Sequence, residues 1–150
     1  MIRLDFLTLA GNLNLLAAFA HIAIIFGGPD WYRFFGAGEE MAQLAAQGSV
    51  EPIFITLFIA LVLVIWALYA WSGAKKIPKL PLLKYALLII SSIYLLRGVA
   101  GLVAPFVSNH PQITQNTLTF WIVSSLICIA IGFVHIKGII NNWQQLSSST

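Results

Sequence analysis

The chain has 150 residues, of which 59% are hydrophobic and 9% charged, and its formal net charge is +3. A soluble domain carries about 25% charged residues, so eight basic and five acidic residues cannot cover a water-soluble surface. Disordered chains are poor in apolar residues, which excludes disorder as well. The composition therefore predicts one all-α, polytopic membrane domain.

Four apolar segments are long enough to cross a bilayer, whose hydrocarbon core of about 30 Å needs roughly 20 residues of helix. They cover about residues 6–27, 52–71, 82–104 and 117–136, and a polar tail follows at 141–150. Arg3 precedes the first segment as in a signal peptide, but Asp5, Asn12 and Asn14 are unusual in one. We therefore expect a retained helix and a bundle of four transmembrane helices.

The loop between the first two segments predicts a short amphipathic helix on the outer surface. Glu39 and Glu40 begin a helix-prone stretch, and carboxylates are favourable at a helix N-terminus. Met41, Leu44 and Ala45 then share one face at helical spacing. The alternative is an ordered loop that caps the bundle.

The basic residues predict the orientation. Cytoplasmic loops collect lysine and arginine, and most of the basic residues fall on one side of the predicted bundle. They are Arg3, Lys75, Lys76, Lys79, Lys84 and Lys137. Both termini are therefore expected to be cytoplasmic. Because these charges flank hydrophobic segments, they indicate topology and not a nucleic-acid partner.

Arg97 lies inside the third segment. A guanidinium stays charged in a protein, and its placement at mid-bilayer costs at least about 2.5–3.5 kcal/mol. Tyr94 and Gly101 lie three and four residues away, on the same helix face, and Gly98 is the next residue. This pattern favours a paired or cavity-lining arginine, and the alternative is a side chain that extends to the outer surface.

His21 is predicted to lie at the depth of Arg97, since both precede the outer end of a segment by about two turns. Its simplest partner is a backbone or hydroxyl group, with the ring neutral beside the arginine. Together they are predicted to anchor an acid of the outer loop or an anionic lipid group. The possible partners are Asp30, Glu39, Glu40, Glu51, Thr56, Ser124 and Ser125.

The other polar residues indicate no chemistry. Asn12 and Asn14 are expected to form hydrogen bonds between helices, and His135, near the end of the fourth segment, to contact lipid headgroups. Three histidines on separate segments and the single Cys128 predict no metal site and no disulfide. No catalytic or cofactor motif is present. We expect no cofactor and no enzymatic activity, with a membrane-embedded lipid enzyme as an alternative.

Residues 26–39 (FGGPDWYRFFGAGE), 66–73 (WALYAWSG) and 95–98 (LLRG) resemble small four-span inner-membrane proteins of Gram-negative bacteria, most without an assigned function. At least one such protein is reported to form trimers and to support the envelope barrier. The resemblance implies an inner-membrane homo-oligomer, a trimer or a dimer, with membrane lipids as partners. The small multidrug exporters also have four spans, but their first-helix glutamate has no counterpart in this chain.

The sequence thus predicts a non-enzymatic inner-membrane protein that supports envelope integrity or handles lipid. The alternative is a small transporter or channel, with a polar route along His21, Arg97 and the serines of the fourth span. Such a route would need to continue through Asn12, Asn14, Ser91 and Ser92 on the inner side.

Overall fold

The computed structural model describes residues 5–147, except for the side chain of Gln112, and every regular element in this range is a helix. The four predicted spans correspond to α1 (Phe6–Gly27), α4 (Glu51–Gly73), α5 (Leu83–Val107) and α7 (Leu118–Asn141). All four are long and apolar enough to cross a membrane. The short helices are α2 (Pro29–Phe34), α3 (Glu39–Ala46), α6 (Pro111–Thr114) and α8 (Trp143–Ser147).

Side chains at the helix starts explain several of these boundaries. The Asp5 carboxylate accepts hydrogen bonds from the Leu7 amide (3.1 Å) and the Thr8 hydroxyl (2.6 Å), so it caps α1. Thr117 caps α7 in the same way, with its hydroxyl oxygen 3.1 Å from the Phe120 amide. Each cap satisfies an amide that has no partner within its own helix.

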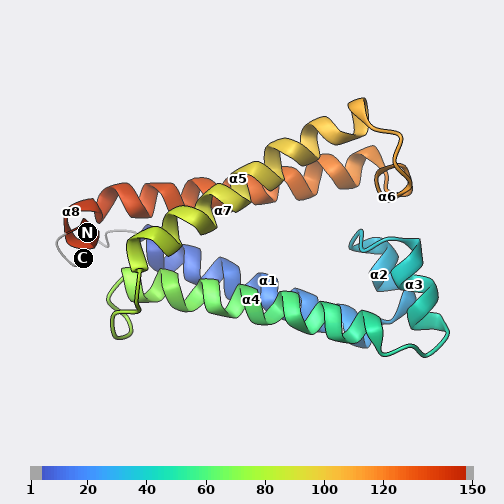
Figure 1. Ribbon diagram of the computed structural model, residues 1–150, viewed down its shortest axis with the longest axis horizontal. Helices are drawn as coiled ribbons and strands as arrows, with labels where there is room; N and C mark the ends of the chain where they lie inside the picture. The colour runs from blue at the N-terminus through green and yellow to red at the C-terminus, as the bar shows by residue number, and fades with distance from the viewer. Residues whose placement is uncertain (1–4, 148–150) are drawn as a thin grey trace.

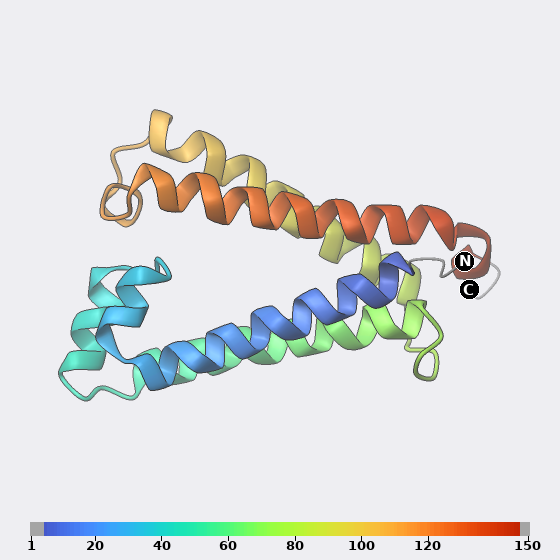
Figure 2. The ribbon, with the colours of Figure 1, turned by 180° about the vertical axis from the view of Figure 1, so that it is seen from behind.

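The long helices form two pairs, α1 with α4 and α5 with α7 (Figure 1). The pairs meet mainly through α1 with α7 and α4 with α5. Seen from behind, they lie close at one end and diverge toward the other (Figure 2). We call the first the lysine end, because the α4–α5 loop there holds Lys75, Lys76 and Lys79. We call the second the cap end, because α2, α3 and α6 lie there.

The lysine end is held by an apolar core from five helices. Leu7 of α1, Leu87 of α5 and Ile139 of α7 are buried together, and Leu146 of α8 joins them. The predicted polar tail therefore begins with a packed helical turn, because Leu146 supplies an apolar contact. Arg3 and residues 148–150 lie outside the described residues.

The cap end contains two helices between the first two spans. The predicted α3 is present, and its Met41, Ala42 and Ala45 pack against Tyr32 of α2 and Ile24 of α1. Its apolar face is thus satisfied within the protein, which supports the interpretation of this segment as a cap.

Glycines allow α5 and α7 to pack closely. A Cβ atom at Gly98 would lie 3.0 Å from the Ser125 carbonyl oxygen and 3.1 Å from the Ile129 amide nitrogen. Both are backbone atoms and cannot move aside alone. Since lipid gives apolar helices no drive to associate, such close packing is a main source of helix–helix stability in a membrane.

We expect Gly98→Val to separate α5 from α7 and to lower the free energy of unfolding by about 1–3 kcal/mol, as other overpacking substitutions do. Thermal unfolding in detergent micelles would measure this. Ala100→Val is the matched control, because Ala100 is exposed on the same helix. Equal melting temperatures for the two variants would contradict the packing argument.

Candidate functional site

Three polar side chains from three helices meet inside the bundle, and we call them the buried polar cluster: Asn14 of α1, Tyr94 of α5 and His135 of α7. The Tyr94 hydroxyl donates to Asn14 Oδ1 (2.6 Å), and Asn14 Nδ2 lies 3.1 Å from His135 Nε2. Asn14 and His135 are both 0% exposed. The cluster therefore joins the two helix pairs through hydrogen bonds that solvent does not reach.

Aromatic rings surround the cluster. The Tyr94 and His135 rings are stacked with centroids 5.7 Å apart, and Trp66 of α4 meets Tyr94 edge-on at 5.3 Å. All four long helices thus contribute a side chain at this level. The cluster combines fixed polar geometry with apolar walls, as ligand-binding and proton-binding sites in membranes do.

The partners of His135 define its hydrogen-bonding state. Nδ1 lies 3.0 Å from the Ile131 carbonyl oxygen, which can only accept, so Nδ1 carries a hydrogen. Asn14 Nδ2 donates to the Ala10 carbonyl (2.9 Å) and has one further hydrogen, which points to Nε2. Nε2 must then be an acceptor. The complete set of bonds requires a neutral ring with its hydrogen on Nδ1.

The prediction that His135 contacts lipid headgroups is wrong, because the residue is fully buried. The predicted fourth span ended at residue 136, but α7 continues to Asn141. The additional turn places His135 inside the bundle, and the small Gly138 lets α7 approach Leu7 of α1. Lys137 was the misleading signal, since a charged residue suggested the end of the span.

The prediction that Asn12 and Asn14 form hydrogen bonds between helices is confirmed. Asn12 Oδ1 accepts from Trp71 Nε1 of α4 at 3.1 Å, and Asn14 bonds to α5 and α7. Asn12 therefore joins the two helices of the first pair, whereas Asn14 joins the first pair to the second.

Arg97 is exposed on α5 and lies beside α7. Its guanidinium carbon is 5.2 Å from the centroid of the Trp121 ring, and a Cβ atom at Gly101 would contact both Arg97 Nη1 and Ser125 Oγ. The side chain thus extends from residue 97 toward the cap end, across the space that Gly101 leaves open. Among the described residues, which include all five Asp and Glu side chains, Arg97 forms no ion pair.

The serines beside Arg97 differ in their bonding. Ser124 donates to the Trp121 carbonyl at 3.3 Å. Ser125 is 0% exposed, and its Oγ has no hydrogen-bond partner among the residues that the structure describes. An unsatisfied buried hydroxyl is uncommon, because most buried polar side-chain atoms have a hydrogen-bond partner.

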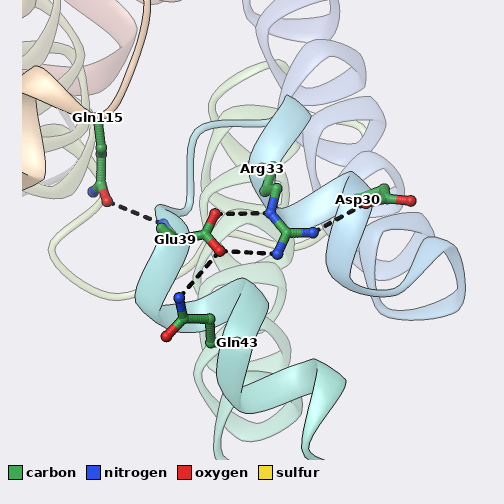
Figure 3. Close-up of polar contacts among 5 residues, drawn as sticks. All are labelled: Asp30, Arg33, Glu39, Gln43 and Gln115. Atoms are coloured by element: carbon green, nitrogen blue, oxygen red, sulfur yellow. Dashed lines mark hydrogen bonds and ion pairs between the residues drawn. The ribbon is translucent and has the colours of Figure 1, made fainter.

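The acids predicted as possible partners of Arg97 lie elsewhere. Figure 3 shows the cap, where Arg33 holds Glu39 through two hydrogen bonds (2.7 and 2.9 Å) and Asp30 through one (3.0 Å). The Glu39 amide also donates to Gln115 Oε1 at 3.0 Å, which connects α3 to the α6–α7 loop. Glu40 and Glu51 are exposed and form no ion pair within the described chain.

His21 and Thr56 also find partners away from Arg97. His21 Nδ1 lies 2.8 Å from the Ala17 carbonyl oxygen of its own helix. The Thr56 hydroxyl donates to the Pro52 carbonyl at 2.7 Å and lies 3.4 Å from Tyr32 Oη. Within residues 5–147, no hydrogen bond, ion pair or ring contact joins His21 to Arg97.

In the described part of the chain, no group of three or more His, Cys, Asp or Glu residues could hold a metal ion. Comparisons with protein-family models, with curated proteins and with solved structures find no match. The length and apolar character of the four long helices decide the general class. The chain is a multi-pass membrane protein. Its candidate sites are the buried polar cluster and Arg97 with its neighbours.

The cap ion pairs are expected to weaken in acid. The hydrogen bonds from Arg33 hold the pKa of Glu39 below its ordinary value. The pair therefore stabilises the cap above the ordinary glutamate pKa and is lost as the pH falls through the lowered value. We expect Glu39→Gln to speed amide hydrogen exchange in α2 and α3 about two- to fivefold at neutral pH, as for an exposed ion pair.

Glu40→Gln is the matched control, because Glu40 is the neighbouring residue and has no ion pair in the described chain. Exchange in this variant should equal that of the wild type. Equal exchange in all three proteins would show that the ion pair does not hold the cap.

Proposed function

We propose that this chain is a non-enzymatic membrane protein that binds an anionic lipid through Arg97 and thereby supports the integrity of a bacterial envelope. The observation that carries the proposal is a permanent positive charge on a spanning helix without a carboxylate partner among the described residues. A charge in this position needs an anion or water to offset its desolvation.

A lipid phosphate fits the surroundings of Arg97. The guanidinium offers a planar fork of donors that matches phosphate oxygens. Trp121 lies one turn from the cap end of α7, with the guanidinium over its ring, and tryptophan is enriched at the headgroup level. The exposed side of Arg97 is open to lipid, whereas a site for a free anion in water would need access from solvent.

We expect Arg97→Gln to reduce the amount of anionic lipid bound after gentle solubilisation at least tenfold. Charged hydrogen bonds of this kind contribute about 1.5–3 kcal/mol. Native mass spectrometry after exchange into phosphatidylglycerol or phosphatidylcholine would measure the bound lipid. Arg97→Lys should retain part of it, since it keeps the charge and loses the planar fork.

Arg33→Gln is the matched control, because Arg33 is paired with acids of the cap. It should leave lipid binding unchanged. Arg97→Gln protein that assembles normally and retains wild-type amounts of phosphatidylglycerol would contradict the proposal. The same spectra would report the subunit number of the proposed homo-oligomer, a trimer or a dimer.

The proposed setting is the bacterial inner membrane, with the lysine end in the cytoplasm. Lys75, Lys76 and Lys79 support this orientation through the bias of cytoplasmic loops toward positive charge. Single cysteines at Lys76 and Gln47, each in a Cys128→Ala background, would test it. A membrane-impermeant thiol reagent applied to intact spheroplasts should label position 47 and leave position 76 unlabelled, and the reverse pattern would invert the topology.

The alternative function, a small transporter or channel, has less support. The hydroxyls of Ser91 and Ser92 both donate to the Leu88 carbonyl of their own helix, at 2.9 and 2.8 Å. The expected polar route on the lysine side therefore lacks two of its members. Ion or dye movement above the empty-vesicle rate in phosphatidylglycerol-containing proteoliposomes would favour transport over lipid binding.

A further inference from the structure

The buried polar cluster has a feature that structural hydrogen bonding alone does not require, namely a titratable ring at its centre. Asn14 and Tyr94 would suffice to join α1 to α5. His135 extends the network to α7 and is the one member whose charge can change near neutral pH. The cluster shares no residue with the proposed lipid site at Arg97.

We propose that the buried polar cluster is a proton-binding site, at which a proton taken up on His135 Nε2 weakens the contact between the two helix pairs. In the neutral state, Nε2 accepts a hydrogen bond from Asn14 Nδ2. A proton on Nε2 converts this acceptor to a donor, and two donors then face each other. The hydrogen bond between α1 and α7 is lost unless Asn14 turns its amide over.

The turned amide would be poorly accommodated. Its oxygen would take the place of Nδ2, 2.9 Å from the Ala10 carbonyl, so two acceptors would repel each other. Its nitrogen would take the place of Oδ1 and donate to the Tyr94 hydroxyl. The Tyr94 hydroxyl could then no longer donate its own hydrogen to Asn14 and would need another acceptor. Neither amide orientation satisfies the cluster once His135 is charged.

The surroundings provide no counter-charge for a protonated ring. On α7 the ionisable neighbours in sequence are Cys128 and Lys137, on α5 they are Tyr94 and Arg97, and on α1 the nearest is His21. Tyr69 of α4 packs against the same core. None of these is a carboxylate, and Asp5 is bonded to Leu7 and Thr8 at the start of α1. A proton on His135 would therefore be a buried, uncompensated charge.

The position of the cluster along the bundle determines how its weakening affects the two helix pairs. At the cap, hydrogen bonds from the Glu39 amide to Gln115 and from Asn116 to Gly36 join the two pairs. The two pairs diverge toward the cap end (Figure 2). Weakening the cluster is thus expected to increase the separation of α1 and α4 from α5 and α7.

Spin labels on the two pairs would measure this separation. Phe58 of α4 and Val123 of α7 are 66% and 51% exposed, so labelled cysteines there leave the core intact. In a Cys128→Ala background in detergent micelles, we expect one short distance population at pH 8. A longer or broader population should grow as the pH is lowered to 5. This range lies above the lowered pKa of Glu39, so the cap ion pair remains formed.

His135→Gln cannot take up a proton and should abolish the pH response, whereas His21→Gln, the matched control, should retain it. Tyr94→Phe should shift the midpoint to higher pH by about half a unit to one unit. It removes a hydrogen bond of the neutral state, and in the charged state it removes a hydroxyl without an acceptor. Tyr85→Phe should leave the midpoint unchanged, because Tyr85 is exposed.

Equal distances at pH 8 and pH 5 in the parent protein would overturn the proposal, and so would a His135→Gln response equal to that of the parent. If His135→Gln does not fold, the Tyr94→Phe shift decides, and an unchanged midpoint overturns the proposal. No lipid enters this experiment, so its outcome is independent of the proposed binding at Arg97.

Discussion

Polar groups within the hydrocarbon layer must find their partners inside the protein, and this constraint organises the middle of the bundle. Asn14 has two amide hydrogens and one principal acceptor, and it uses them on Ala10, His135 and Tyr94. Two of those partners belong to other helices. Because a shift of α1 by one residue would break all the inter-helix bonds together, the cluster fixes the register of α1 against α5 and α7 in a way that apolar contacts do not.

The charged side chains also need partners, but several of them find these at the ends of the bundle and not in its middle. Arg33 lies in the cap, where Glu39 and Asp30 neutralise it. Asp5 is used to cap α1. The Asp and Glu side chains are therefore distributed at the two ends of the bundle, and none of them forms an ion pair with Arg97 in the described chain. The proposal of an anionic lipid rests on this distribution, since the neutralising charge must then come from outside the described chain.

The sequence was sufficient for the four spans because length and apolar composition decide them. It could not predict which helices pair, because spans that are apolar on most faces show no preferred side. The central role of His135 depended on the true end of α7. Lys137 lies before that end, with its ammonium group 5.8 Å from the Phe6 ring, and so does not terminate the helix.

The site around Arg97 also depended on information that is not local in sequence. Its place within the third span was predictable from the sequence, but its partner depends on the direction of the side chain. Gly101 leaves room for the guanidinium to extend toward the cap end, where it lies over the ring of Trp121 of α7. Both features arise from the packing of α5 on α7, which brings residues 24 positions apart into contact.

The two proposed sites are neighbours on α5, where Tyr94 belongs to the cluster and Arg97 lies about one turn closer to the cap end. Arg97 follows Tyr94 by three residues and His21 follows Asn14 by seven, so each lies near the same face as a member of the cluster. The cluster and the cap contact hold the two pairs at two levels, with Arg97 and His21 between them. If proton uptake on His135 separates the two pairs as proposed, the change would begin about one turn from Arg97 on the same helix.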